Sequence, residues 1–263
     1  MLQTLSTLQL AVTAVLILLG AALSLLLQMG IAQSLLIAAV RTVVQLLLVG
    51  LVLKTLYTAD APLLVALAML AMLGAAAYET FSRQDRRFAG PTAAALAGLP
   101  IAMASILVTG LAIATLQPAQ WLAPQVAIPL FGIVLGNAMS ACSLTLNTFT
   151  TALVRDRAAI EAQLALGATR YAALRGIQRS AARNGMIPII NQMAAAGVIT
   201  LPGMMTGQIL AGMPPVEAAK YQIFVLFLLA GAAALAVAAT AYAAAWRATD
   251  HRDRLRLDRL RST

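Results

Sequence analysis

The sequence is poor in the side chains that soluble enzymes use for catalysis and metal binding. Its 263 residues include one cysteine, Cys142, and one histidine, His251. One cysteine excludes an intramolecular disulfide, and the pair leaves too few nitrogen and sulfur ligands for a zinc site. No zinc-ligand helix or serine–histidine pair is recognisable. We therefore predict no catalytic residues and no cofactor bound by this chain, and metal ligands stay unassigned.

Charged residues are also scarce. They make up 10% of the chain, whereas hydrophobic residues make up 61% and the mean hydropathy is +0.88. Soluble domains are roughly 25% charged and about 45–50% apolar. A single soluble core cannot bury this much apolar surface, so most of the chain faces lipid or other lipid-buried helices. The sequence therefore predicts an all-α, polytopic membrane protein.

Apolar runs long enough to cross a membrane recur along the chain. A helix needs about 20 apolar residues to cross a hydrocarbon core of about 30 Å. No basic residue precedes the first run, which is longer than the apolar region of a signal peptide, so we interpret it as a retained spanning helix. We predict seven spans, at about 8–28, 36–57, 63–81, 93–115, 125–147, 188–212 and 221–245.

The basic residues predict the orientation. Fifteen of the 18 fall in three patches that follow the third, fifth and seventh spans, and the positive-inside rule assigns that side to the cytoplasm. Tyr57, Trp121 and Tyr221 fall near the opposite boundary, as expected for aromatic residues at headgroup depth. The N-terminus is thus predicted outside and the C-terminus inside, and the net charge of +9 reflects this arrangement rather than nucleic-acid binding. The patches are Arg83, Arg86 and Arg87; Arg155, Arg157, Arg170, Arg175, Arg179 and Arg183; and Arg247, Arg252, Arg254, Arg256, Arg259 and Arg261.

The last patch lies in a charged tail at 247–263. Basic and acidic residues alternate there. Mixed charge of this kind is typical of solvated segments. We expect a solvated helix or a disordered cytoplasmic end.

The longest polar interruption, at about 148–186, shows helical periodicity on both sides of a turn. Leu166-Gly167-Ala168-Thr169 combines a glycine helix stop with a threonine N-cap. The segment predicts a cytoplasmic hairpin of two helices. Its apolar positions are Ile160 and Leu164 on the first helix, and Tyr171, Leu174, Ile177 and Ala181 on the second.

This hairpin resembles the cytoplasmic helix through which ABC permeases contact their ATPase. One common version carries Glu-Ala-Ala, three residues and then Gly, and here Glu161-Ala162-Gln163 precedes Gly167. The familiar pattern has its proline thirteen residues after the glycine, whereas Pro188 is 21 residues on, so an ordinary amphipathic hairpin stays an alternative. The coupling candidates are Glu161, Gly167, Thr169, Arg170 and Arg183.

A phosphate loop of the G-x-x-x-x-G-K-[ST] type is absent from the sequence. If the protein is an active pump, ATP and Mg²⁺ are therefore bound by a separate partner chain.

The sixth span contains Pro188 at its start and Leu201-Pro202-Gly203 well inside it. Proline removes a backbone donor and glycine adds freedom, so the helix should kink or unwind near Pro202. Freed backbone groups at membrane depth survive only when buried in protein or lining a wet cavity, which favours a substrate pathway here. The methionines can equally fill a core or face lipid, and Asn137 can equally bond another helix. The pathway candidates are Asn137, Met139, Asn191, Pro202, Gly203, Met204, Met205 and Gln208.

Arg41 and Gln45 complete the pathway candidates. They are four residues apart on the second span and share a helix face. An ionisable residue inside a span is a functional candidate, although Arg41 can also anchor the helix by reaching the interface. No acidic residue falls in mid-span, which disfavours a proton-coupled secondary transporter or channel.

Several stretches also resemble the FetB-type family of ABC permeases. The most specific is Leu201 to Gly212 (LPGMMTGQILAG), followed by Pro215, Ala218 and the 220–223 stretch KYQI. Further similarities lie at Gly136 to Met139, at Leu164 to Thr169, and at Arg41 with Gln45. Some members carry Asp and Lys before the Leu-Pro-Gly, where this chain has Asn191 and Ala194.

The resemblance implies a single permease domain, 1–263, in the bacterial inner membrane. It implies a homodimer that works with a FetA-like ATP-binding subunit in iron export and resistance to oxidative stress. Plant STAR2-like relatives are linked instead to nucleotide-sugar transport, so another substrate stays an alternative. Ligand counting does not itself indicate iron, because iron(II) favours carboxylate and imidazole ligands whereas methionine suits softer ions.

Overall fold

The computed structural model describes residues 6–59, 61–90, 92–116, 123–250 and 252–262. Trp121 and His251 lie outside these ranges. The chain divides into two compact units, Met1–Asp60 and Ala61–Thr263, which are described separately and are called unit 1 and unit 2.

Unit 1 is a helical hairpin of α1 (Thr7–Leu26) and α2 (Ala32–Ala59). Ser6 caps α1: its hydroxyl accepts from the amide of Gln9, and its own amide donates to the Gln9 side chain at 2.9 Å. The turn to α2 uses positive φ at Gln28 and Gly30. Most apolar side chains of both helices are exposed within the unit, so lipid or other protein must cover them.

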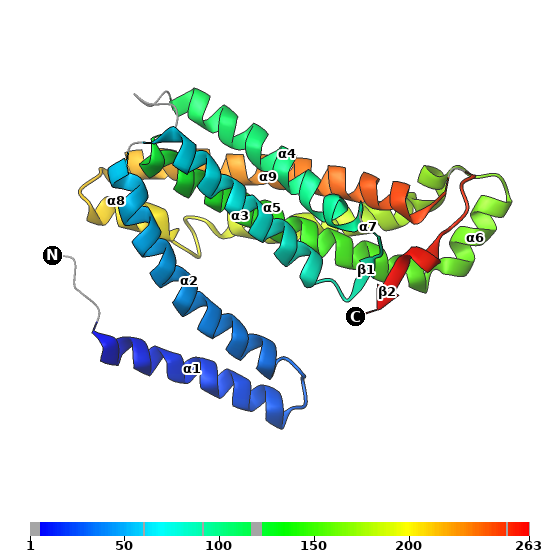
Figure 1. Ribbon diagram of the computed structural model, residues 1–263, viewed down its shortest axis with the longest axis horizontal. Helices are drawn as coiled ribbons and strands as arrows, with labels where there is room; N and C mark the ends of the chain where they lie inside the picture. Colours follow the sequence, from blue (N-terminus) through cyan, green and yellow to red (C-terminus); the bar gives the residue numbers. More distant parts are fainter. Residues whose placement is uncertain (1–5, 60, 91, 117–122, 251, 263) are drawn as a thin grey trace. The chain divides into compact units, whose positions relative to one another are not determined.

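Unit 2 is built around one long central helix. The helix α5 (Pro124–Arg155) contacts α3 (Pro62–Ser82), α4 (Thr92–Leu116), α7 (Arg170–Ala195) and α9 (Pro215–Ala248). The short helices α6 (Arg157–Ala165) and α8 (Gly203–Leu210) lie at opposite ends of the unit, as Figure 1 shows. The remaining elements are β1 (Arg86–Phe88), the 3-10 turn η1 (Leu257–Arg259) and β2 (Leu260–Ser262).

Side-chain contacts fix the directions of the three central helices. Asn137 bonds Leu229, and Cys142 contacts Thr240, so α5 and α9 run parallel. Gln178 bonds Ala241, and Gly185 lies against Val237, so α7 runs antiparallel to α9 and therefore to α5. The ends of α5 and α9 therefore lie together at one end of unit 2.

Small residues let these helices approach closely. Ala138 of α5 and Ala232, Ala233 and Ala236 of α9 are fully buried. Gly185 of α7 lies at the closest point, where an added Cβ would meet Thr145 Oγ1 at 2.1 Å. Small contact residues are typical of helix packing in membranes, where van der Waals contact rather than water exclusion holds helices together.

Six of the described helices are long and apolar enough to cross a membrane: α1, α2, α3, α4, α5 and α9. They coincide with six of the seven predicted spans. The predicted sixth span, 188–212, is not one helix but the end of α7, an interruption and α8. The helix α5 also continues to Arg155, well beyond the predicted end near 147. The less apolar residues 148–155 are therefore part of the same helix.

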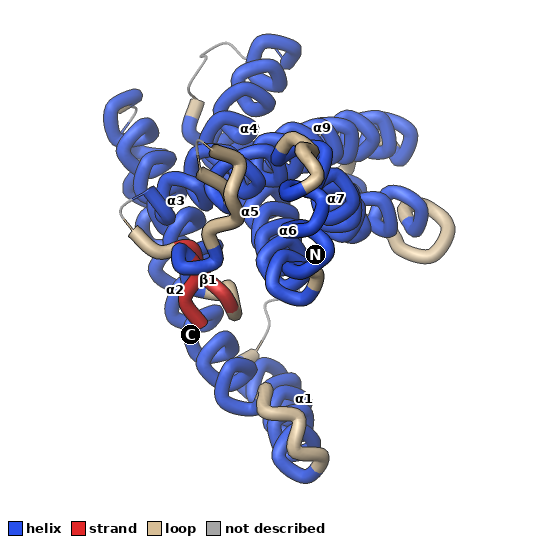
Figure 2. The backbone as a smooth tube through the Cα atoms, turned by 90° about the vertical axis from the view of Figure 1, so that its right-hand side faces the viewer, coloured by secondary structure: helices blue, strands red, loops and turns tan. Residues whose placement is uncertain are grey.

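The prediction for the C-terminal tail was wrong. Instead of a solvated helix or disordered end, residues 260–262 form β2, which pairs antiparallel with β1 in the α3–α4 connection (Figure 2). The all-α prediction thus missed a two-stranded ribbon. Leu255, Leu257 and Leu260 are partly buried and pack against the core, which holds the tail against unit 2.

Candidate functional site

The turn of the predicted cytoplasmic hairpin joins α6 to α7. Gly167 has a φ of +89°, and the amide of Ala168 donates to the Gln163 carbonyl at 3.0 Å. Thr169 is the N-cap of α7, and its hydroxyl accepts from the amide of Ala172 at 3.4 Å. The predicted glycine stop and threonine cap are both confirmed.

The hairpin packs firmly against the rest of unit 2. Ile160 of α6 and Leu174 of α7 are buried in one cluster with Phe149 and Leu153 of α5. Tyr171 lies against Tyr242 of α9, with ring centroids 5.8 Å apart. Of the predicted apolar face, Ile177 and Ala181 are also buried, whereas Leu164 is partly buried and Tyr171 stays exposed at its edge. The hairpin is therefore held against the C-terminal ends of α5 and α9, which lie side by side.

The second hairpin helix does not end near residue 186, as the predicted hairpin boundary implied. The helix α7 continues through Pro188 to Ala195 without interruption. It therefore connects the hairpin turn directly to the first half of the predicted sixth span. Its 26 residues correspond to about 39 Å of helix.

Four of the five coupling candidates lie around the hairpin turn. Glu161 accepts from Arg157 at 2.9 Å on the exposed side of α6. Arg170, the first residue of α7, pairs with Asp253 of the C-terminal tail. Gly167 and Thr169 form the turn itself, whereas the exposed Arg183 lies farther along α7.

A groove of about 350 Å³ opens beside the hairpin, between the end of α5, α6 and α7. Its lining includes Ala152, Asp156, Ile160, Gln163 and Gly176. The hydrogen bond from Arg155 holds the pKa of Asp156 below its ordinary value, so this carboxylate stays ionised at neutral pH. The ion pair is lost only as pH falls through that lowered pKa. The groove thus combines an apolar floor with a charged rim.

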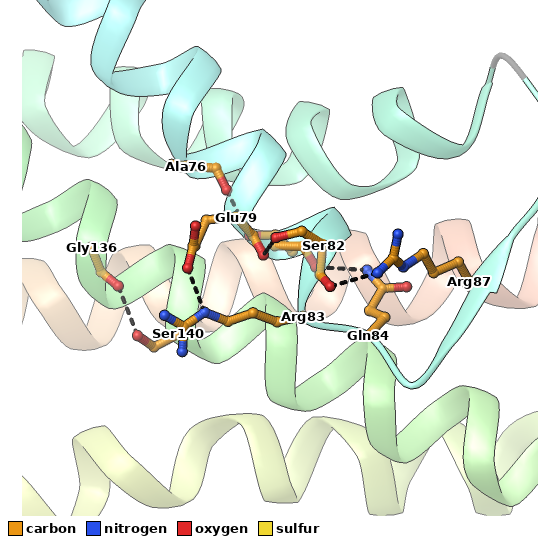
Figure 3. Close-up of polar contacts among 9 residues, drawn as sticks. Ala76, Glu79, Ser82, Arg83, Gln84, Arg87, Gly136 and Ser140 are labelled. Atoms are coloured by element: carbon orange, nitrogen blue, oxygen red, sulfur yellow. Dashed lines mark hydrogen bonds and ion pairs between the residues drawn. The ribbon is translucent and has the colours of Figure 1, made fainter. Parts of the chain in front are cut away.

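The first basic patch is also structured (Figure 3). Arg83 pairs with Glu79 at 2.7 Å, and Arg87 donates to the Ser82 carbonyl at 2.8 Å. Gln84 donates to the Thr80 carbonyl at 3.0 Å. These contacts fix the chain between α3 and β1. Glu79, the acidic residue nearest a span centre, is therefore engaged in an ion pair.

The predicted interruption near Pro202 is confirmed, although it begins earlier. The helix α7 ends at Ala195, Gly197 follows with a φ of +82°, and the amide of Thr200 donates to the Ala195 carbonyl. Pro202 is the N-cap of α8, which begins at Gly203. Seven residues thus separate α7 from α8, where a single span with a kink was predicted.

Five pathway candidates lie in the two helices on either side of the interruption: Asn191 in α7, and Gly203, Met204, Met205 and Gln208 in α8. Asn191 and Gly203 are exposed, Met204 is 36% exposed, and Met205 and Gln208 are half-buried.

One further polar group was missed from the sequence. Gln222 of α9 is buried, and its Oε1, like that of Gln208 in α8, has no hydrogen-bond partner within the described residues. Buried amide oxygens are normally bonded, so each of these two oxygens is an exception within the described residues. Gln222 is the second residue of the predicted seventh span, where a polar side chain is expected at the membrane boundary, so it was singled out only as part of the family-like KYQI stretch.

The remaining pathway candidates lie elsewhere. Asn137 donates to the Leu229 carbonyl at 2.9 Å, and Met139 packs beside the buried cluster that contains Phe131. Arg41 and Gln45 are exposed on α2 of unit 1. Asn137 is therefore a helix-packing residue in this structure.

No group of three or more histidine, cysteine, aspartate or glutamate side chains comes together within the described residues. The described part of one chain therefore supplies no conventional cluster of carboxylate, imidazole and thiolate ligands.

The chain is similar in sequence to a known protein family and to several membrane proteins. The chain matches the model of the uncharacterised protein family UPF0014 over residues 7–248. It is 38% identical over 234 residues to a UPF0014 membrane protein of Synechocystis sp., covering 86% of this chain and 88% of the relative. It is 33% identical over 236 residues to the UPF0014 membrane protein STAR2 of Oryza sativa subsp. japonica, covering 88% and 79%.

A bacterial relative carries a functional name. The chain is 32% identical over 205 residues to "Probable iron export permease protein FetB" of Escherichia coli, covering 77% of this chain and 76% of the relative. No solved structure matches this chain. The relatives and the six long apolar helices together identify a multi-pass membrane protein.

Proposed function

This chain belongs to the UPF0014 family of membrane proteins, as its resemblance to FetB-type permeases indicated, and we propose that it is the membrane-spanning subunit of an ABC transporter. The observation that carries the proposal is the α6–α7 hairpin, which packs on the adjacent C-terminal ends of α5 and α9. ATP hydrolysis belongs to a separate FetA-like subunit, which binds ATP and Mg²⁺.

The continuity of α7 supplies the mechanism. A displacement of the hairpin turn reaches the interruption after Ala195 through one rigid helix, because no break intervenes. The interruption and the short α8 then change the access of the pathway, since the interruption is largely exposed and no described residue of α8 is buried, so little packing holds them in one arrangement. Closure of the partner's nucleotide sites thereby alternates access around Pro202.

We also propose that α7 and α8 together make the sixth of seven crossings. The end of α5 and the start of α9 lie at opposite ends of unit 2, because α5 and α9 run parallel. The chain between them must therefore traverse the unit. With the basic patches in the cytoplasm, seven crossings place the N-terminus outside.

The proposed cargo is iron, exported from the cytoplasm. Its support is the E. coli relative and that relative's printed name. Two copies of the permease are proposed, so a metal site would be assembled between copies rather than within one. An ABC permease for a nucleotide sugar, or an ATP-independent secondary transporter, are the competing functions.

Co-purification tests the proposal. The tagged chain, extracted in mild detergent, is expected to retain an ATP-binding subunit whose ATPase activity rises with iron(II). Retention of the ATPase without an iron response would favour another cargo. A chain that purifies alone and transports without ATP would replace this proposal by the secondary transporter.

A further inference from the structure

Asp250 and residues 252–254 of the C-terminal tail are linked by hydrogen bonds after the end of α9. Asp250 is buried, and one of its carboxylate oxygens accepts from the amides of Arg252 and Arg254, each at 2.9 Å. Asp253, at the tip, has a φ of +54°, and its amide donates to the Asp250 carbonyl at 3.1 Å. These two hydrogen bonds to one carboxylate stabilise the backbone on either side of Asp253.

Asp253 contacts the hairpin turn through both of its carboxylate oxygens. Oδ1 forms an ion pair with Arg170 Nε at 2.5 Å, outside hydrogen-bond geometry, and Oδ2 accepts from the backbone amide of Arg170 at 3.4 Å. Arg170 is the first residue of α7, so the carboxylate also meets the positive end of the helix. The Arg170 side chain is 18% exposed, which limits solvent screening of the pair.

The other side of the tail is attached to α9 and to the α3–α4 connection. Arg259 donates to the carbonyls of Arg247 and Thr249, at 3.1 and 3.2 Å. Arg247 in turn donates to the Ala89 carbonyl at 2.9 Å. The ribbon of β1 and β2 adds backbone hydrogen bonds. The tail therefore links three separate segments: the hairpin turn, the end of α9 and the α3–α4 connection.

From this arrangement we propose that Asp253 is a positioning residue, which holds the α6–α7 turn for the ATP-binding partner. Without the contact the turn could tilt about the start of α7 and absorb the partner's displacement. With it, the displacement moves α7 and α9 together. This inference rests on the proposed function for its role in coupling, but the contact itself can be tested in the permease alone.

The test uses matched neutral variants of the full chain. Asp253→Asn keeps the side-chain shape and the left-handed backbone, which asparagine tolerates, and removes the charge. Asp258→Asn is the control, because that carboxylate lies in the same tail and pairs with Arg256, two residues earlier. Arg170→Gln approaches the contact from the other partner and completes a double-mutant cycle with Asp253→Asn.

Hydrogen exchange of the permease without its partner measures the contact. The amides of the first turn of α7 are expected to exchange about fivefold faster in Asp253→Asn and in Arg170→Gln, with no further increase in the double variant. Asp258→Asn should leave them within about twofold of wild type. Unchanged exchange in Asp253→Asn, or additive effects in the double variant, would overturn the inference whatever the function of the protein.

Reconstitution with the ATP-binding subunit measures the role. The transported cargo per ATP hydrolysed is expected to fall about threefold or more in Asp253→Asn, while the amount of bound ATPase stays as in wild type and in Asp258→Asn. Faster exchange with an unchanged transport ratio would overturn the coupling role and leave the proposed function standing. A wild-type chain that binds no ATPase would instead overturn the proposed function, and the coupling role with it.

Discussion

Gly185 shows how one residue limits the packing of three helices. An added Cβ would approach Thr145 Oγ1 at 2.1 Å, the Ala141 carbonyl at 2.9 Å and Val237 Cγ2 at 3.0 Å. Thr145 cannot easily move away, because its hydroxyl donates to the Ala141 carbonyl at 2.8 Å. This requirement could not be predicted from the sequence, since the closeness of α5, α7 and α9 arises only in the folded unit.

We expect Gly185→Ala to destabilise the protein by about 1–3 kcal/mol, the usual cost of overpacking a core. Gly176→Ala is the control on the same helix, where an added Cβ meets nothing within 4 Å. That change should be neutral or stabilising by roughly 0.5–1 kcal/mol, because alanine favours helix. Thermal unfolding in detergent compares the two, and equal melting temperatures would contradict the packing described.

The hydrogen bond of Asn137 between α5 and α9 can be tested by substitution. Its amide donates to the Leu229 carbonyl, and interhelical hydrogen bonds in membrane proteins contribute about 0.6 kcal/mol on average. Asn137→Ala should therefore lower stability slightly while leaving cargo selectivity unchanged. Competition assays with different metal ions measure the selectivity, and an altered preference would return Asn137 to the pathway.

At the scale of the element, the hairpin was predicted better than the tail. Gly167 and Thr169 act through local backbone geometry, which a few neighbouring residues determine. The strand at 260–262 depends on a partner more than 170 positions earlier, at 86–88. The mixed charge of the tail indicated a solvated segment, and its few leucines did not identify the partner strand. Long-range pairing decided the outcome.

Gly167 allows coupling to be tested with backbone conformation as the variable. With a φ of +89° and nothing within 4 Å of an added Cβ, substitution meets strain rather than collision. Gly167→Val should cost roughly 1–2 kcal/mol in the turn and reduce transport per ATP hydrolysed. Gly167→Asn, which tolerates this conformation, should behave nearly as wild type. A valine variant that still couples transport to hydrolysis would argue against the hairpin as the coupling element.

At the scale of the whole molecule, composition predicted the class of protein and the broad positions of six long helices. The sixth predicted span could not be placed correctly from periodicity, because α7 combines a basic first half with an apolar second half. The helix therefore resembles neither a soluble nor a spanning helix along its full length. Its basic first half packs inside unit 2 through Gln178, which bonds Ala241, and Asn184, which bonds Thr148.

The proposed crossing by α7 and α8 predicts where introduced thiols react. Cys142 is fully buried, so the native thiol should resist a membrane-impermeant maleimide. Leu166→Cys in the hairpin turn and Met29→Cys between α1 and α2 should be labelled from the cytoplasmic side. Met213→Cys, between α8 and α9, should be labelled from outside. Labelling of the 166 and 213 positions from one side would contradict the seven-crossing topology.

The most direct test of the central claim is iron(II) flux in proteoliposomes that contain this chain and its ATP-binding partner. We predict flux that requires hydrolysable ATP and that stops when the partner is omitted or its ATPase is inactivated. Equal iron flux through the chain alone, without ATP, would contradict its assignment as an ABC permease.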